Sequence, residues 1–442
     1  MHRTRLLALA GASLLGGGVL VAVHLRGRCH AEGPAIPSGS AVPSIARVSV
    51  ATQHEDEPPP QGSPPVPGLD LTRVSVAGEG LVAPADGGVA HLTLDPDLQH
   101  TAIGLMAARH LPEAAAVVMD VQTGRLLVYA SRAEQGPARD LCAEASAPSA
   151  SVFKIVTAAA LVEDAHLDAD TRQCYSGGEQ RITATDLIDD PHRDRWCATL
   201  ASALGRSINT VFARLAKEHL VPAQLDAMAR RFGYGDALAF DAPVQAGAIH
   251  VPAETLEFAR TAAGFWNSTL SPVQAAEMSA IVARGGEAVR PVIVDEVVST
   301  GGWALRSAPA TPSVRRVLTK ETADELAAMM EHTVMEGTSW RAFHDGQGIA
   351  FLPGVAVAGK TGTLTDPETQ RYYTWFTGFA PARPAPGAPP QVAVGVLVVN
   401  GPSWQIKANV LARDILRTYF AKHDLQGVSR PSLTAVARRR KK

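Results

Sequence analysis

Five short apolar segments of the chain have the pattern of β-strands, and they lie in two groups far apart in the sequence. The first group covers residues 115–120 and 125–131, which are joined by a short turn signal. The second group covers residues 355–363, 373–380 and 391–399. Strands that gather at both ends of a domain, without alternating with helices, favour one antiparallel sheet over a series of βαβ units.

Helical spacing of apolar residues surrounds these strands. Residues 95–110 form one predicted helix and residues 406–420 a second, while roughly 200 Ala-rich residues between the two groups of strands read as mostly helical. The candidate core residues of the first helix are Leu98, Ile103, Leu105 and Met106. The predicted fold class is α/β in the α+β sense: an antiparallel five-stranded sheet with flanking helices plus an all-helical subdomain. A cleft is expected between the sheet and the helices.

The N-terminal end carries an apolar run that is long enough to span a membrane. Residues 1–5 form a short basic stretch, and residues 6–23 are free of charged side chains. This length favours an uncleaved transmembrane anchor over 6–25, with cleavage of a signal after Ala31 as the alternative. Arginines lie on both sides of the run in equal number, so the positive-inside rule does not decide its orientation.

The segment after the predicted anchor differs in composition from the rest of the chain. Residues 26–88 are rich in Pro, Gly, Ser and Ala and lack regular apolar spacing, which is typical of a disordered spacer. The folded domain is therefore expected to cover residues 89–425. Residues 426–442 end in a wholly basic stretch and are predicted to be a solvated tail.

Charge and basic-residue usage narrow the functional classes. The formal net charge is −2, which gives no electrostatic reason to expect a nucleic acid partner. Of the 41 basic residues, 8 are Lys and 33 are Arg. A chain that prefers Arg so strongly is expected to keep Lys where an amine must lose its proton.

The four cysteines form no CxxC pair, which argues against a zinc ribbon or a thioredoxin-like motif. Outside the cytoplasm, Cys174 and Cys197 are the expected disulfide pair. Buried free thiols remain the alternative, and a metal site that includes His192 is a more distant one because its spacing fits no common ligand pattern. No metal or cofactor is predicted.

A first chemical motif is the run Ser151-Val152-Phe153-Lys154. Positions i and i+3 share one face of a helix, so Lys154 can lie beside the hydroxyl of Ser151. A serine hydroxyl becomes a good nucleophile when a neighbouring base takes its proton, and a lysine with a lowered pKa can be that base. Taken alone, this pattern is equally typical of a serine that caps a helix.

Two further motifs follow in the chain. Ser207-Ile208-Asn209 precedes a predicted helix, and its two polar side chains would point the same way in an extended segment. Lys360-Thr361-Gly362-Thr363 ends an apolar strand, where the two threonines share a face and the glycine lets a ligand approach the backbone. Each motif alone also fits a helix cap or a strand end, but their order matches the serine acyl enzymes of the penicillin-binding group.

With these motifs in place, the sequence from about His91 to Phe420 resembles the transpeptidase domain of penicillin-binding proteins. Further stretches that carry the resemblance are residues 94–99, 120–130, 270–274 and 336–338. The resemblance implies the penicillin-binding-protein/β-lactamase-like transpeptidase fold. It also implies an enzyme of peptidoglycan biosynthesis that needs no cofactor.

The resemblance implies catalytic roles for four residues. Ser151 would be the nucleophile that is acylated by the penultimate D-Ala of a stem peptide, and Lys154 would be its base. Ser207 would relay a proton to the leaving D-Ala, and Lys360 would supply positive potential. The backbone N–H groups of Ser151 and Thr363 would form the oxyanion hole.

The substrate-binding residues implied by the resemblance are Asn209, Thr361, Gly362 and Thr363. Asn209 would bind the peptide backbone, and the two threonines would hold the terminal carboxylate. The implied partners are D-Ala-D-Ala stem peptides, β-lactam antibiotics as covalent inhibitors, the inner membrane through the N-terminal helix, and other cell-wall synthesis proteins. The implied location is a bacterial inner membrane with the catalytic domain in the periplasm.

Three alternatives remain at this point. A β-lactamase or a D,D-carboxypeptidase would use the same fold, although Asn209 in the second motif argues against the class D β-lactamases. A non-catalytic scaffold for peptidoglycan or division proteins would be expected to lose the nucleophile or a motif lysine, and this sequence keeps both.

Overall fold

The computed structural model describes residues 64–179, 181–386 and 391–433. The chain divides into residues 1–55 and 56–442, and every described residue belongs to the second unit. The predicted anchor over 6–25 lies outside the described residues, as does most of the basic tail. Within the described ranges, no helix is both long and apolar enough to cross a membrane.

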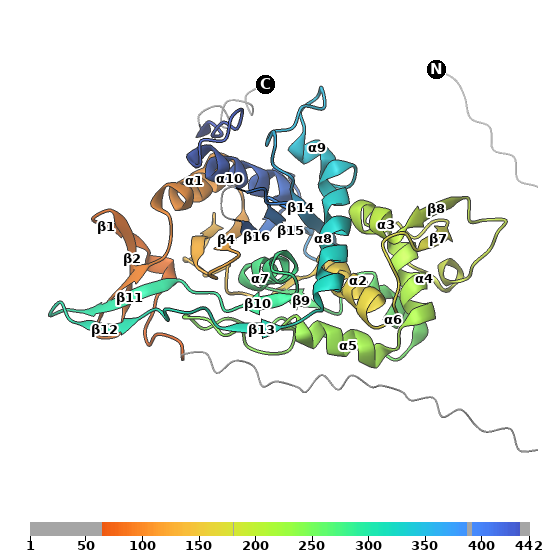
Figure 1. The fold of residues 1–442 in the computed structure, drawn as a ribbon, viewed down its shortest axis with the longest axis horizontal. Helices are drawn as coiled ribbons and strands as arrows, with labels where there is room; N and C mark the ends of the chain where they lie inside the picture. Colours follow the sequence, from red (N-terminus) through yellow and green to blue (C-terminus); the bar gives the residue numbers. More distant parts are fainter. Residues whose placement is uncertain (1–63, 180, 387–390, 434–442) are drawn as a thin grey trace, which may run out of the picture. The chain divides into compact units, whose positions relative to one another are not determined.

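A five-stranded antiparallel sheet forms the centre of the fold (Figure 1), as predicted. Its strands run in the order β14-β15-β16-β4-β5, so the two groups of predicted strands meet where β16 pairs with β4. The bounds are β4 (Glu113–Asp120), β5 (Leu126–Ala133), β14 (Ala358–Asp366), β15 (Arg371–Ala380) and β16 (Val392–Asn400). Every strand expected in this sheet is present, with ends that differ by a few residues.

Both faces of the sheet are covered. Alternate residues of β16 pack in opposite directions: Val394 and Val396 join one core, and Ala393 and Leu397 join the other. Helices α1 (Pro96–Ala108) and α10 (Ala408–Lys422) cover the first face, and α7 (Pro272–Ala283) covers the second (Figure 1). Because β16 is buried on both sides, its sequence is continuously apolar rather than alternating.

Helix α1 begins where the sequence places a strong start signal. The side chain of Asp95 caps the helix by accepting hydrogen bonds from the backbone N–H groups of Asp97 and Leu98, and Pro96 stands at the first helical position. The prediction that Ile103 is a core residue was wrong, because this residue is 43% exposed. The buried face of α1 is formed by Leu98, Ala102, Leu105 and Met106, a spacing that leaves Ile103 on the opposite face.

The segment between the two groups of strands supplies the helical subdomain. Its helices are η2 (Ala150–Phe153), α2 (Lys154–Glu163), η3 (Ala184–Leu187), α3 (Leu200–Arg206), α4 (Asn209–His219), α5 (Pro222–Arg231), α6 (Thr255–Ala262), α8 (Lys320–Met335) and α9 (Trp340–Phe343). Helix α8 contacts both α3 and the edge strand β14, so it joins the helices to the sheet.

The expectation of an all-helical subdomain, within a segment predicted to be mostly helical, needs correction. It also contains the paired strands β6 (Ala147–Pro148) with β9 (Thr269–Leu270), β7 (Arg172–Tyr175) with β8 (Trp196–Thr199), and β10 (Glu287–Val289) with β13 (Val314–Arg316). These strands have two to four residues each, which is too short for a period of two to be visible in the sequence.

A second five-stranded sheet corrects the predicted boundary between linker and folded domain. It has the order β1-β2-β3-β11-β12, with β1 (Ser75–Ala77), β2 (Gly80–Ala85), β3 (Gly88–Leu92), β11 (Val294–Ser299) and β12 (Ala304–Ser307). The short helix η1 (Leu71–Arg73) precedes it. Residues 64–88 are therefore part of the fold and not of a disordered spacer. Their Gly- and Pro-rich strands are held by pairing between β3 and β11, a contact that local sequence does not reveal.

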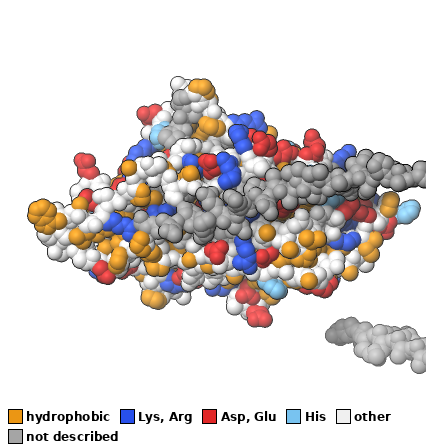
Figure 2. Space-filling view, turned by 60° about the horizontal axis from the view of Figure 1, so that its bottom comes forward, with side chains coloured by type: hydrophobic (Ala, Val, Ile, Leu, Met, Phe, Trp, Pro, Cys, Tyr) orange, Lys and Arg blue, Asp and Glu red, His pale blue; other side chains and the backbone are white. Residues whose placement is uncertain are grey.

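The small sheet exposes several apolar side chains. The residues Val76, Trp303 and Leu305 are 73%, 77% and 56% exposed. Figure 2 shows hydrophobic side chains at the narrow end of the view, the end where Figure 1 places β1 and β12.

Candidate active site

The first motif lies at the start of the helix that enters the subdomain. Ser151 belongs to the 3-10 turn η2, and Lys154 begins α2 directly after it. The Nζ atom of Lys154 lies 3.0 Å from the Oγ atom of Ser151, so the predicted contact between serine and lysine is present. Lys154 Nζ also lies 2.7 Å from Oδ1 of Asn209 and 2.5 Å from the carbonyl oxygen of Ala263.

These three contacts suit a lysine that has lost its charge. The Asn209 and Ala263 oxygens can only accept hydrogen bonds, so they use the two protons of a neutral amine. The lone pair of that amine then points to Ser151, whose hydroxyl can donate. The amine can therefore take the serine proton without changing any of its contacts.

The electrostatic surroundings favour this neutral form. Lys154 and Lys360 are both completely buried. Burial, and then the positive charge of Lys360, hold the pKa of Lys154 well below its ordinary value. Burial also lowers the pKa of Lys360 to about 7. Two amines that share one buried site cannot both carry a proton easily, so one of them is available as a base near neutral pH.

The second motif is split between two helices. Ser207 ends α3 in the left-handed conformation (φ 59°), and Asn209 is the first residue of α4. The Asn209 amide nitrogen donates to the carbonyl oxygens of Gly178 (3.3 Å) and Glu179 (2.8 Å). Since both carbonyls need a donor, the amide orientation is fixed and Oδ1 is directed to Lys154. Asn209 therefore holds the lysine as well as lining the cleft.

The third motif lies on β14, at the edge of the central sheet. Lys360 Nζ donates to Oγ of Ser207 (2.9 Å) and to the carbonyl oxygen of Thr361 (2.8 Å), which joins the second and third motifs. The hydroxyls of Thr361 and Thr338 lie 2.6 Å apart. Thr363 is exposed and lines the same cleft.

Two glycines allow the motif segments to pack closely. A Cβ atom on Gly362 would come within 3.2 Å of the carbonyl oxygen of Ser149. A Cβ atom on Gly264 would come within 2.5 Å of the carbonyl oxygen of Ala150, and Gly264 has a φ of +78°. The absence of these side chains lets β14 and the turn after α6 lie against the nucleophile segment. The sequence predicted that Gly362 lets a ligand approach the backbone. It did not predict that the segment at Ser149 lies against this glycine.

The three motifs surround one cleft of about 210 Å³. Of the predicted site residues, Ser151, Ser207, Asn209, Thr361, Gly362 and Thr363 line it, and the two lysines lie buried behind Ser151 and Ser207. Residues that the sequence did not single out for the site are Glu179, Thr338, Thr374, Trp375, Lys407 and Asn409. Thr338 stood in a stretch already noted at 336–338, and the others carry no motif signal.

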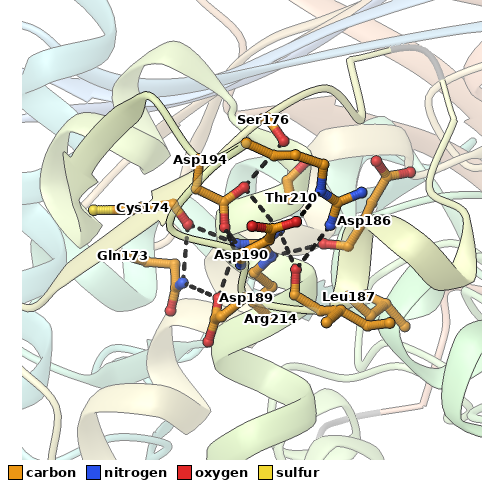
Figure 3. Close-up of polar contacts among 12 residues, drawn as sticks. Gln173, Cys174, Ser176, Asp186, Leu187, Asp189, Asp190, Asp194, Thr210 and Arg214 are labelled. Carbon is orange, nitrogen blue, oxygen red and sulfur yellow. Dashed lines mark hydrogen bonds and ion pairs between the residues drawn. The ribbon is translucent and has the colours of Figure 1, made fainter.

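Helix α4 holds in place the loop between β7 and β8 (Figure 3). Arg214 of α4 is 3% exposed and donates to the carbonyl oxygens of Cys174, Asp186 and Ile188. Its guanidinium also pairs with the carboxylate of Asp194 (2.5 Å). Because the same helix carries Asn209 at its first position, the loop carbonyls and the lysine contact are fixed together.

The loop is closed covalently at its base. Cys174 and Cys197 form the expected disulfide, across the β7–β8 pair. Cys142 is a buried free thiol, while Cys29 lies outside the described residues. Among the residues that the structure describes, no group of three or more His, Cys, Asp or Glu side chains could hold a metal ion.

Comparison with known proteins identifies the family. The family model described as Penicillin binding protein transpeptidase domain matches residues 114–417. The chain is 27% identical over 322 residues to stage V sporulation protein D of Bacillus subtilis, which covers 68% of this chain and 48% of that protein. It is 30% identical over 271 residues to peptidoglycan D,D-transpeptidase PbpA of Mycobacterium tuberculosis, which covers 58% and 50%. The chain thus spans about half the length of these curated relatives.

Solved structures show the same fold. The D,D-transpeptidase domain of a peptidoglycan glycosyltransferase from Eggerthella lenta has a TM-score of 0.61 and 25% identity, covering 76% of this chain and 83% of that chain. An imipenem acyl-enzyme complex of penicillin-binding protein A from M. tuberculosis has a TM-score of 0.60 and 21% identity, covering 75% and 79%. Since the family model matches well over half of the chain, this protein belongs to the penicillin binding protein transpeptidase domain family.

Proposed function

We propose that this protein is a serine-type D,D-transpeptidase that cross-links peptidoglycan stem peptides through an acyl-enzyme on Ser151. The observation that carries the proposal is the buried amine of Lys154, which lies 3.0 Å from the Ser151 hydroxyl. The name of the M. tuberculosis relative, a peptidoglycan D,D-transpeptidase, supports the substrate class. The imipenem complex of a fold neighbour supports the covalent step.

In the proposed acylation, neutral Lys154 takes the proton of Ser151 while Oγ attacks the carbonyl carbon of the penultimate D-Ala. The backbone N–H groups of Ser151 and Thr363 stabilise the negative oxygen of the tetrahedral intermediate. The C–N bond then breaks, and Ser207 gives its proton to the leaving D-Ala nitrogen. Lys360 donates to Ser207 (2.9 Å), so it can restore that proton.

The second half of the reaction transfers the acyl group. Lys154 first passes the proton taken from Ser151 to solvent while Lys360 regains one, so that both amines return to their starting protonation states. An amine of a second peptide strand then attacks the ester carbonyl and loses a proton to Lys154. The bond between the carbonyl carbon and Oγ of Ser151 breaks, and Lys154 returns the proton to Oγ, which releases Ser151 as a hydroxyl. Thr361 and Thr363 hold the donor's terminal carboxylate during the first half. Attack by water in place of the amine would make the enzyme a carboxypeptidase.

The proposal is tested with the full chain in detergent, a donor peptide that ends in D-Ala-D-Ala, and an acceptor peptide with a free amine. We expect a cross-linked product together with release of one D-Ala for each bond formed, as measured by mass spectrometry. Release of D-Ala without any cross-linked product would favour a carboxypeptidase. Rapid turnover of penicillin would favour a β-lactamase, and no reaction with either compound would favour the scaffold.

We also propose that the catalytic domain lies in the periplasm and is held to the inner membrane by residues 6–25. The disulfide between Cys174 and Cys197 supports this location, since such bonds persist mainly outside the cytoplasm. In protein isolated from cells, peptide mapping should find both cysteines unmodified by maleimide until a reductant is added. Reduction should lower the free energy of unfolding by about 3 kcal/mol. Labelling of both thiols without reductant would contradict the proposed location.

A further inference from the structure

We propose that Thr338 is a positioning residue that sets the direction of the Thr361 hydroxyl, so that this hydroxyl donates a hydrogen bond to the carboxylate of the donor substrate. The inference rests on the proposed function and adds a residue that none of the three motifs contains. Thr338 follows the C-terminal end of α8 and lines the cleft.

Thr338 touches the elements of two motifs at once. Its backbone N–H donates to the carbonyl oxygen of Gly205 (3.0 Å), which lies in α3 just before Ser207. Its hydroxyl lies 3.3 Å from the same carbonyl oxygen and 2.6 Å from the hydroxyl of Thr361. A single side chain therefore links α3, which ends in the second motif, to β14, which carries the third.

Counting protons shows why this contact matters for a carboxylate. Each hydroxyl has one proton. If the Thr338 hydroxyl donates its hydrogen bond to the carbonyl oxygen of Gly205, the short contact requires the Thr361 hydroxyl to donate to Thr338. The Thr361 oxygen then presents only lone pairs to the cleft. A carboxylate would be repelled by that arrangement, because it also offers only lone pairs.

The opposite arrangement creates a donor for the substrate. If Thr338 donates to Thr361, the proton of Thr361 is free to point into the cleft. The carbonyl oxygen of Gly205 loses only the long hydrogen bond from the Thr338 hydroxyl, and it keeps the hydrogen bond from the Thr338 N–H. A carboxylate in the cleft favours this arrangement, because a hydrogen bond to a charged acceptor is stronger than one between neutral groups.

The positive charge of the cleft acts in the same direction. Lys360 Nζ donates to the carbonyl oxygen of Thr361 and is buried directly behind this residue. The carboxylate thus meets a chain of two hydroxyls, Thr338 to Thr361, in which each bond polarises the next. The terminal carboxylate of the donor, or the carboxylate of a β-lactam, is the group that this chain recognises.

The test compares Thr338→Val, which removes the hydroxyl at nearly constant volume, with Thr338→Ser, which keeps it. Second-order acylation rates of the full chain are measured with benzylpenicillin and with its uncharged methyl ester, and slow adducts are quantified by mass spectrometry after long incubation. We expect Thr338→Val to slow acylation by benzylpenicillin about tenfold and to leave the ester rate unchanged. Thr338→Ser should restore the rate with benzylpenicillin.

A matched control is Thr365→Val, an exposed position on the same strand as Thr361 that does not line the cleft. It should change neither rate. If Thr338→Val slows both compounds equally, or neither, Thr338 does not act through carboxylate recognition and the inference is wrong. Failure of the wild-type protein to react with either compound would instead count against the proposed function.

Discussion

Replacing Ser151 by alanine is expected to abolish covalent labelling by fluorescent penicillin while leaving the protein folded. The substitution removes a single oxygen atom at the surface of the cleft, where the side chain is only partly buried. The other cleft hydroxyls cannot replace it, because the amine of Lys154 is directed to Ser151 at 3.0 Å. Loss of the nucleophile from serine enzymes of other folds lowers turnover by about 10⁶-fold, so labelling should fall below detection.

The matched control is Ser146→Ala, since Ser146 is an exposed serine five positions earlier in the same segment. Its labelling should equal that of the unmodified protein. Both variants should keep the thermal unfolding midpoint of the wild type, as measured by calorimetry. Stable labelling of the Ser151→Ala protein at any residue of the cleft would overturn the assignment of the nucleophile.

Replacing Lys154 by methionine is expected to slow acylation about 10³-fold, a typical contribution of a positioned general base. Methionine has nearly the same length and no amine, so it fills the space while removing the proton acceptor. The unfolding midpoint should change little, because the desolvation cost of the completely buried amine is removed together with its hydrogen bonds to Asn209 and Ala263. A loss of activity combined with retained stability separates catalysis from folding.

The pH profile of the unmodified protein provides a second check on this role. The proposed acylation requires Lys154 to be neutral, so the rate should rise with pH as the buried pair of amines loses its first proton. The pKa of Lys360 is lowered to about 7, so the rate should fall again above that pH if its positive charge is needed. Lys320→Met, at an exposed lysine of α8, should leave this profile unchanged.

An acylation rate for Lys154→Met within tenfold of the wild type would exclude Lys154 as the base.

The sequence predicted the parts of the site that depend on local geometry. The contact between Ser151 and Lys154 follows from their i, i+3 spacing, and the strand that carries Lys360 follows from its apolar run. The central sheet was also predictable, because its strands are long and lie in two clear groups. In each of these cases, the individual helical turn or strand is recognisable within about ten consecutive residues.

The missed features depend on residues far apart in the chain. Backbone carbonyl oxygens of three residues accept hydrogen bonds from the side chains of Asn209 and Lys154: those of Gly178, Glu179 and Ala263. Every residue type has such an oxygen, so the sequence cannot indicate these contacts. Thr338 contacts Thr361 across 23 residues, and the resemblance noted at 336–338 did not indicate this contact. The small sheet was missed for the same reason, since β1 and β2 are short and their fold depends on β3 pairing with β11.

The pairing of β3 with β11 also determines when the small sheet can form during synthesis. Thr93, next to β3, donates its backbone N–H to the carbonyl oxygen of Ile293 (2.8 Å), which lies just before β11. Its hydroxyl lies 2.6 Å from the carbonyl oxygen of Leu126 and 3.2 Å from that of Val292, 199 residues later. The first three strands therefore leave the ribosome long before their partner exists, with one edge of β3 unpaired. Non-local pairing of this kind is slow, and an open strand edge is prone to aggregation. The small sheet can thus be completed only after β11 has been made, and a newly made chain depends on protection of the β3 edge until then.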